Sequence, residues 1–281
     1  MKRKFGDVVV DTVVPYMVAT LYALLILVPI FFVFVSSFKQ NAEIFSRPLD
    51  FPVKWDLTNY SKLLSPKFKF NFGIAIENSI IITVGAELLT IILAFPAAYA
   101  IARVKTRFSP VFETIFGFGF LIPTFTIMLP TFLLMANLGI LYSRVSLILF
   151  YPAARLPISV MIMASFLRQI SSEIENSAIL DGANTFQRII YIFLPLSAPG
   201  IVTVIILNFI FIWNEFFLAL ILLNTQNRTI QIALSTLRSI QKIDYGMMAA
   251  GILLSVLPVL VLFVIFQEKI VQGMMAGAIK E

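Results

Sequence analysis

The sequence contains no cysteine and no histidine, and only 13% of its residues are charged. Without cysteine it forms no disulfide, and without either residue it offers no thiolate or imidazole ligand to a metal. The Ser-His and Cys-His pairs that activate many enzymatic nucleophiles are missing as well. These absences exclude most designs of a hydrolytic or metal-dependent active site.

Apolar residues dominate what is present. They make up 59% of the 281 residues, and the mean hydropathy of +0.95 is far above that of soluble domains. The sequence therefore indicates an integral membrane protein. Its net charge of +6 comes from short basic runs beside apolar stretches. Contact with the anionic headgroups of membrane lipid accounts for these runs, and no nucleic acid is expected as a partner.

Six stretches are long enough to cross the hydrocarbon core of a bilayer as helices, which requires about 20 mainly apolar residues. None alternates as the strands of a membrane barrel do. The predicted fold class is therefore all-α, a single transmembrane domain of six helices over residues 1–281. The predicted spans are 11–38, 72–103, 110–136, 145–167, 198–223 and 246–266.

The first stretch follows the basic residues 2–4, but its apolar run is too long for a signal peptide, and we interpret it as a retained helix. Six crossings place both termini and the segment 171–197 on one side of the membrane. The outer loop 39–71, long enough to form a small cap, lies on the other side. Lysine and arginine are equally numerous on the two sides, but the short basic runs 2–4 and 103–107 next to span ends favour cytoplasmic termini.

The segment between the fourth and fifth predicted spans, 171–197, is polar in an otherwise apolar chain. Ser172 followed by Glu175 matches a capping box, which predicts the start of a short helix. Asp181 followed by Gly182 is typical of a helix end, because glycine readily adopts the left-handed conformation found there. The pattern predicts a short helix that ends in a glycine elbow.

A second short helix is predicted from Asn184 and Gln187 to Pro195. Apolar residues recur at helical spacing on both helices: Ile174 and Ala178 on the first, and Phe186, Ile189, Ile190 and Phe193 on the second. A rigid L-shaped loop of this kind would fit a groove on a partner protein. An amphipathic linker on the membrane surface is the alternative, and periodicity alone does not choose between the two.

Gly182, nine residues and then Ile192-Phe193-Leu194-Pro195 resemble the EAA motif of ABC importer permeases, in which Glu-Ala-Ala, three residues, Gly and nine residues precede I-x-L-P. The resemblance covers nearly the whole chain and fits the carbohydrate-importer branch, the MalG-like permeases of binding-protein-dependent transport. Three further stretches carry it: ENSIIITVGAELLTIILAFPAAYAIARVKTRF at 77–108, FIWNEFFLALILL at 211–223 and EKIVQGMMAGAIKE at 268–281.

One part of the motif differs. Where the family has Glu-Ala-Ala, this sequence has Asn176-Ser177-Ala178, so the acidic anchor to the ATPase is missing at its usual position. Glu173 or Glu175 could supply a charge contact instead, or docking could depend on the shape around Gly182. The ATPase-coupling residues that the resemblance implies are Glu173, Glu175, Asn176, Ser177, Ala178, Asp181, Gly182, Ala183, Phe186, Ile192, Leu194 and Pro195.

The resemblance implies a type I ABC importer permease, a transport subunit and not an enzyme, that crosses a bacterial-type cell membrane several times. The sequence lacks a G-x-x-x-x-G-K-[ST] phosphate-binding loop, so ATP and Mg²⁺ are expected on a partner, and no catalytic residue, metal or cofactor is expected in this chain. The implied partners are a second, MalF-like permease subunit, two ABC ATPase subunits and an extracytoplasmic solute-binding protein. The implied solute is a sugar, an oligosaccharide or a related polyol.

Polar groups inside the predicted spans are candidates for the transport path, because a charge at mid-bilayer is costly and faces protein or water. They are Glu87, Arg155, Asn208, Asn214 and Glu215. Arg155 could pair with Glu87 or with Glu215 inside the bundle. Alternatively, these groups close hydrogen bonds between helices, far from any solute.

On composition alone, a six-helix channel or a secondary carrier that is not coupled to ATP is the alternative function. A carrier usually has more spans or an internal repeat, and neither is evident in the sequence. An ABC permease should co-purify with an ATPase and a second permease, whereas a channel or a carrier should not.

Overall fold

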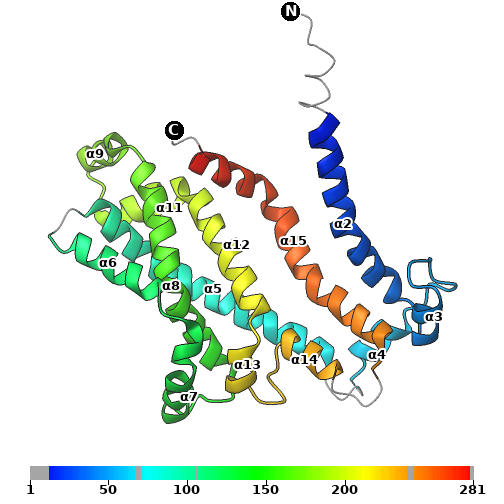
Figure 1. Ribbon diagram of the computed structural model, residues 1–281. Coiled ribbons are helices and arrows are strands. Elements are labelled where there is room, and N and C mark those ends of the chain that lie inside the picture. Colours follow the sequence, from blue (N-terminus) through cyan, green and yellow to red (C-terminus); the bar gives the residue numbers. More distant parts are fainter. Residues whose placement is uncertain (1–12, 67–70, 105–106, 239–242, 279–281) are drawn as a thin grey trace, which may run out of the picture. The chain divides into compact units, whose positions relative to one another are not determined.

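The computed structural model describes residues 13–66, 71–104, 107–238 and 243–278, and their side chains as far as Gln267. The basic residues 2–4 and the end of the C-terminal tail lie outside this part of the chain. All regular elements within it are helical (Figure 1). The chain divides into two compact units: unit 1 comprises residues 1–73 and 234–257, and unit 2 comprises residues 74–233 and 258–281.

Four helices of the described residues are long and apolar enough to cross a membrane, and the number rises to six if each of two bent helix pairs is counted as one span. The four are α2 (Val14–Ser36), α5 (Phe72–Arg103), α8 (Arg144–Gln169) and the Tyr245–Gln267 part of α15 (Tyr245–Ala278). Prolines inside these helices do not end them, because neighbouring helices and local adjustments can satisfy the freed backbone groups.

The stretch 110–136, predicted as the third span, is not one straight helix. It contains a bend of 89° next to Pro123. Proline lacks an N–H for the helical ladder and disfavours helical backbone at the residue before it, so the helix stops there. The two arms are α6 (Ser109–Phe120) on one side and η2 (Thr124–Ile127) with α7 (Met128–Asn137) on the other.

The fifth predicted span, 198–223, is interrupted as well. α12 (Ala198–Asn214) ends before Glu215, whose backbone is extended, and α13 (Phe217–Leu222) begins after it. The Glu215 carboxylate accepts hydrogen bonds from two backbone N–H groups in the first turn of α13, at 2.8 and 3.0 Å. It therefore caps this short helix. The chain then continues into α14 (Ile230–Leu237).

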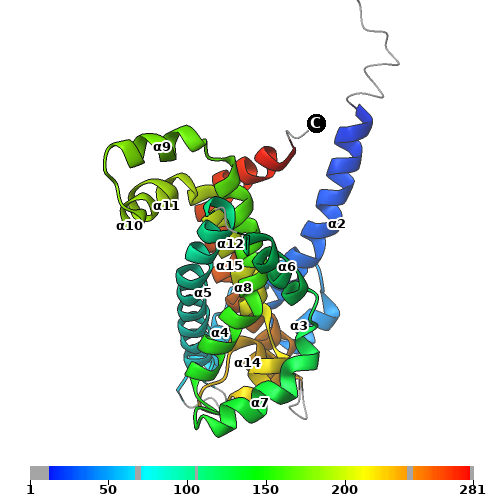
Figure 2. The same cartoon turned by 90° about the vertical axis from the view of Figure 1, so that its left-hand side faces the viewer.

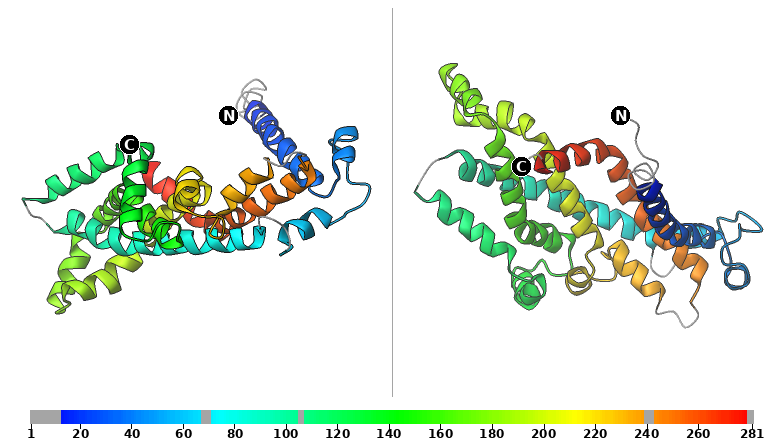
Figure 3. Two further views of the ribbon diagram at one scale, coloured as in Figure 1. Left: turned by 90° about the horizontal axis from the view of Figure 1, so that it is seen from below. Right: turned by 45° about the horizontal axis from the view of Figure 1, so that its top comes forward.

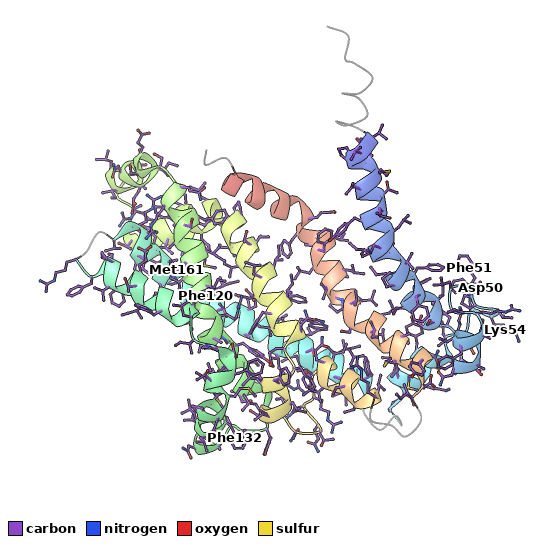
Figure 4. The ribbon with its side chains drawn as sticks, viewed as in Figure 1. Asp50, Phe51, Lys54, Phe120, Phe132 and Met161 are labelled. Atoms are coloured by element: carbon purple, nitrogen blue, oxygen red, sulfur yellow. The ribbon has the colours of Figure 1, made fainter. Side chains whose placement is uncertain are left out.

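In unit 1, the predicted outer loop contains two short helices, α3 (Asn41–Ser46) and α4 (Thr58–Leu64). Lys39, in the turn that follows α2, is fully buried and holds the loop after α3. Its Nζ donates hydrogen bonds to the carbonyl oxygens of Arg47 (2.8 Å) and Asp50 (2.6 Å). Figure 4 shows Asp50 in the loop that this lysine pins between α3 and α4. The buried ammonium thus replaces its water shell with backbone carbonyls.

The Gly246→Ala substitution is expected to destabilise unit 1. Gly246 lies in the first turn of α15, where an added Cβ would be 2.2 Å from the Lys39 carbonyl oxygen and 2.7 Å from Asn59 Nδ2. The backbone must shift, so we expect a loss of about 1–3 kcal/mol. The measurement is the temperature at which half of the detergent-purified protein leaves the monodisperse peak. Gly117→Ala, which meets no atom within 4 Å, is the matched control, and equal temperatures for the two variants would contradict the expectation.

In unit 2, buried residues of α5 and α8, among them the small Ala98 and Ala164, belong to one apolar cluster. Phe193, from the segment after α9, completes this cluster. The segment from α9 to α11 projects from one end of α8, while α7 lies at the other end (Figures 1 and 2). The views in Figure 3 show the same arrangement within this unit. The cluster therefore supports the base of the projecting segment.

Candidate coupling loop and polar path

The segment 171–197, called the coupling loop below, begins with α9 (Ser172–Leu180). The predicted capping box of Ser172 and Glu175 is wrong. The N-cap is Ser171, whose Oγ accepts a hydrogen bond from the N–H of Glu173 (3.1 Å). Since the helix starts one residue earlier than predicted, Glu175 stands one position too far along to reach the N-cap N–H. Its carboxylate is held by other groups, described below.

The glycine elbow is confirmed at Gly182, whose φ of +83° lies in the left-handed region. The N–H of Ala183 donates to the carbonyl of Ala178 (2.9 Å), and the N–H of Gly182 donates to the carbonyl of Ile179 (3.0 Å). These two bonds form a Schellman motif, which satisfies carbonyl groups that the end of α9 would otherwise leave unpaired. An added Cβ at Gly182 would meet no atom within 4 Å, so backbone conformation alone favours glycine here.

The start of the second predicted helix is confirmed. Asn184 Oδ1 accepts from the N–H of Gln187 and Gln187 Oε1 accepts from the N–H of Asn184, both at 2.9 Å, which is a complete capping box. The helical segment ends at Leu196, one residue beyond Pro195, and meets α12 at 72°. Its three parts are α10 (Thr185–Gln187), the π-helical η3 (Arg188–Phe193) and α11 (Leu194–Leu196).

The two predicted apolar faces are only partly buried. Ala178 and Phe193 are buried, whereas Ile174 and Phe186 are exposed, the latter by 70%. The π-helix explains the second case, because its i→i+5 bonds break the 3.6-residue spacing that was to place Phe186 and Phe193 on one face. Leu180, beside the elbow, is 87% exposed. The elbow therefore presents large apolar side chains to its surroundings.

Glu175 lies at the centre of a charged cluster on the inner side of the coupling loop. Its Oε1 accepts hydrogen bonds from Arg188 Nη1 (3.1 Å) and from the Tyr99 hydroxyl (3.0 Å). Its Oε2 lies 3.9 Å from Arg103 Nη1. The Glu175 side chain is only 16% exposed, so it does not offer a free charge to another protein.

Arg103, the last residue of α5, connects several elements. Its Nη2 donates to the carbonyl oxygens of Leu167 and Ile170 at the C-terminal end of α8, where a cation is favoured by the helix dipole. Its guanidinium also stacks on the ring of Phe193, 4.9 Å from the centroid. On the basis of sequence, Arg103 was relevant only to the orientation of the spans. Its position at the end of a predicted span could have indicated a structural role. Its partners could not be predicted, because they are distant in sequence.

The remaining candidates of the coupling loop are divided between solvent and interior. Ala183, Ile192 and Leu194 are half-buried. Of the two carboxylates suggested as a substitute anchor, Glu173 is the exposed one. The exposed candidates are Glu173, Asn176, Ser177, Asp181, Gly182, Phe186 and Pro195.

Within the spans, Arg155 and Asn208 form a hydrogen-bonded link between α8 and α12. Arg155 Nε donates to Asn208 Oδ1 (2.9 Å), and Asn208 Nδ2 donates to Ser159 Oγ (3.0 Å). The Arg155 guanidinium lies 4.4 Å from the ring centroid of Phe211, a cation–π contact. Asn208 and Ser159 are fully buried. These hydrogen bonds join α8 to α12 through Arg155, Asn208 and Ser159.

Glu87 of α5 lies beside this link without joining it. Asn208 and Arg155 are the polar groups that act on its carboxylate, but by hydrogen-bond geometry both of its buried carboxylate oxygens lack a partner within the described ranges. No salt bridge of Arg155 with Glu87 or Glu215 occurs in the part of the chain that the structure describes. In that same part, no three acidic residues gather where a metal could bind.

Glu215 belongs to a different set of contacts. Besides the backbone of α13, its Oε2 accepts a hydrogen bond from the buried hydroxyl of Tyr151 (2.8 Å). The carboxylate is thus used as a cap and as an anchor to α8. Exchanging the charges of Arg155 and Glu215 is therefore not expected to restore a pair.

Asn214 and Glu215 line a pocket of about 530 Å³ at the interruption between α12 and α13. The interruption at Pro123 borders the same pocket, so two breaks in predicted spans meet there. Glu87, Arg155 and Asn208 are not among its lining residues. Pro123, Thr124, Phe125, Met128, Phe211, Asn214, Glu215, Phe216, Phe217 and Leu218 form its wall. A mainly aromatic and apolar wall with a few polar groups is typical of a small-molecule site, and the volume is in the usual range.

Comparison with known proteins places these features in a family. Residues 88–275 match the family described as binding-protein-dependent transport system inner membrane component. The chain is 30% identical to the diacetylchitobiose uptake system permease protein NgcG of Streptomyces coelicolor, over 92% of this chain and 86% of the relative. It is also 30% identical to the trehalose/maltose transport system permease protein MalG of Thermococcus litoralis, over 93% and 94% of the two chains.

A solved structure agrees in fold. A chain of a bacterial ABC transporter involved in the import of the acidic polysaccharide alginate superposes with a TM-score of 0.84 at 25% identity, covering 95% of this chain and 99% of that one. The all-helical architecture, the spans with their two bent pairs and the family match over two thirds of the sequence lead to one assignment. The chain belongs to the binding-protein-dependent transport system inner membrane components, the multi-pass permease subunits of ABC importers.

Proposed function

We propose that this permease carries a sugar, an oligosaccharide or a related polyol into the cell as one of two permease subunits. The other subunits are two ATPases, which bind ATP and Mg²⁺, and an extracytoplasmic solute-binding protein. The names of the relatives support the solute class, since they refer to diacetylchitobiose and to trehalose or maltose. The family description supports the dependence on a binding protein.

The coupling loop is the site at which we expect the ATPase to dock. The observation that carries this proposal is the capped elbow at Gly182, which holds Leu180 and Phe186 exposed in a defined geometry. Exposed apolar side chains on a rigid protrusion suit insertion into a groove of a partner. The loop and both chain termini would then face the cytoplasm. Glu173 is the acidic residue available for a charge contact with the ATPase.

The pocket beside Asn214 is the proposed contact with the solute. It lies beside two breaks, one between α6 and η2 and the other between α12 and α13. Broken helices in transporters commonly border a water-filled path. Phe125, Phe216 and Phe217 offer apolar faces, and Asn214 offers an amide. Glu87, Arg155 and Asn208 would keep the helices that flank this path in register.

The decisive experiment is ATP hydrolysis by the reconstituted four-component complex in proteoliposomes. Maltose, trehalose and diacetylchitobiose are added in turn with the binding protein. At least one of them is expected to stimulate hydrolysis and to accumulate inside the vesicles. A permease that purifies without an ATPase and a second permease, and that conducts sugars without ATP, would instead be the channel or carrier of the alternative function.

Leu180→Ser is expected to weaken binding of the ATPase. Truncation of a central apolar anchor typically costs about 2 kcal/mol or more, which corresponds to roughly thirtyfold in affinity. The measurement is titration of the purified ATPase onto the permease in nanodiscs. Leu138→Ser is the matched control, because Leu138 is exposed and also precedes a left-handed glycine at a helix end. Equal affinities for the two variants would argue against docking at the elbow.

A further inference from the structure

The ion pairs of Glu175 differ from the others of the described residues in their burial. Arg103 and Glu175 are 9% and 16% exposed, and Arg188 is 15% exposed. The pairs Arg144–Glu77 and Arg168–Glu113 are at least one third exposed on both sides. Exposed pairs contribute little to stability, whereas removal of one partner from a buried pair leaves an uncompensated charge. Glu175 is therefore the position at which a single change has a large effect on how the loop is held.

The partners of Glu175 come from the coupling loop itself and from the end of α5. Tyr99 and Arg103 belong to the end of α5, and Arg188 belongs to η3, beyond the elbow. Through Arg103 the contacts continue to the last carbonyl groups of α8. One carboxylate thus joins α9 to η3 and both of these to the ends of two spans. Without it, two guanidinium groups face each other with no anion between them.

We propose that Glu175 is a positioning residue that fastens the coupling loop to α5 and α8, so that a displacement of the loop moves these two helices. The inference rests on the proposed docking of the ATPase at the elbow. In place of the missing acidic anchor at Asn176, the neighbouring acid faces inward and acts within the permease. The ATPase pushes on the exposed outer side of the loop, and Glu175 passes that movement to the spans.

The test is the number of sugar molecules imported per ATP hydrolysed, measured in proteoliposomes of the whole complex. The sugar is whichever of maltose, trehalose and diacetylchitobiose stimulates the wild-type complex most. Glu175→Gln is expected to lower this ratio about fivefold or more, the usual size of a coupling between two sites. A change that only reduced the number of folded complexes would lower hydrolysis and import together and leave the ratio unchanged.

Two further variants sharpen the test. Glu113→Gln removes a bidentate ion pair with Arg168 (3.0 and 2.7 Å) between α6 and α8. It loses the same charge as Glu175→Gln, but it should leave the ratio of sugar imported to ATP hydrolysed unchanged. Glu175→Arg combined with Arg188→Glu restores an attractive pair and should recover part of the ratio that Glu175→Arg alone loses.

Three results would overturn the inference. If the wild-type complex couples import to hydrolysis, an unchanged ratio in Glu175→Gln overturns the inference about Glu175 and leaves the proposed function standing. An equal fall of the ratio in Glu113→Gln has the same consequence. A wild-type complex whose ATP hydrolysis responds to no sugar of the panel overturns the proposed function, and this inference with it.

Discussion

Gly182→Val is expected to lower the amount of sugar imported per ATP about tenfold, whereas Gly139→Val is expected to leave this ratio unchanged. The two glycines occupy matching positions. Gly139, after α7, has a φ of +70°, and the N–H groups of Gly139 and Ile140 donate to the carbonyls of Ala136 (3.0 Å) and Met135 (3.1 Å). These are the bonds of a second Schellman motif. Neither glycine has an atom within 4 Å of an added Cβ.

The cost of valine in the left-handed conformation should therefore be similar at both sites, about 1–2 kcal/mol or somewhat more for a branched side chain. Gly139 follows α7 and Gly182 follows α9, and these two helices lie at opposite ends of α8 in unit 2 (Figure 1). Only Gly182 belongs to the coupling loop. A difference between the two variants thus reports what the elbow does, because the loss of stability is matched.

Import of labelled sugar and release of phosphate are to be measured in the same proteoliposomes, with the folded fraction of each variant determined by size-exclusion chromatography. Gly182→Ala should show a smaller effect in the same direction, since alanine is less strained than valine at positive φ. If both valine variants lost coupling to the same extent, strain in any helix end would be sufficient and the role of the elbow would be refuted.

Arg155→Met is expected to give the largest loss of stability among single substitutions in the spans. It removes the cation that faces the buried Glu87 carboxylate and leaves Asn208 without its donor. Loss of the hydrogen bond from the charged Arg155 to Asn208 typically costs about 1.5–3 kcal/mol, and the buried Glu87 carboxylate loses its nearby cation as well. Glu87→Gln alone should be tolerated, because the carboxylate oxygens accept no hydrogen bond and Arg155 keeps its link to Asn208.

The double variant Glu87→Gln with Arg155→Met should be more stable than Arg155→Met alone, since no unpaired charge is then buried. Apparent Tm values in detergent, followed by intrinsic tryptophan fluorescence, give the order. An Arg155→Met protein as stable as the double variant would show that Glu87 does not sense this arginine.

The long helices were predictable because their stability in lipid depends on length and hydrophobicity, which are local properties of the sequence. α5 covers the predicted stretch 72–103, and α8 extends the stretch 145–167 only to Arg144–Gln169. The interruptions were not predictable in the same way. Glu215 ends α12 because its carboxylate reaches the backbone of α13 and the hydroxyl of Tyr151, and such a choice of partner depends on the folded arrangement.

In the candidate site, too, local motifs were predictable and contacts between distant residues were not. The elbow at Gly182 and the capping box of Asn184 and Gln187 were predicted, because both motifs are complete within a few residues. Tyr99 and Arg103, which contact Glu175, are distant from it in sequence, so the inward orientation of its side chain could not be predicted. For Arg155 the sequence left both pairing with a carboxylate and hydrogen bonding between helices open, and the structure shows a hydrogen bond to the amide of Asn208.

The π-helical turn at Arg188–Phe193 also places a condition on chain length. Each further residue rotates a helix about its axis, so insertion of one residue before Phe193 would turn its ring away from the ring of Tyr99, 5.1 Å distant, and out of its buried position. The interval of nine residues between Gly182 and the Ile-Phe-Leu-Pro stretch is therefore a geometric requirement. Chimeras of related permeases should exchange this interval whole.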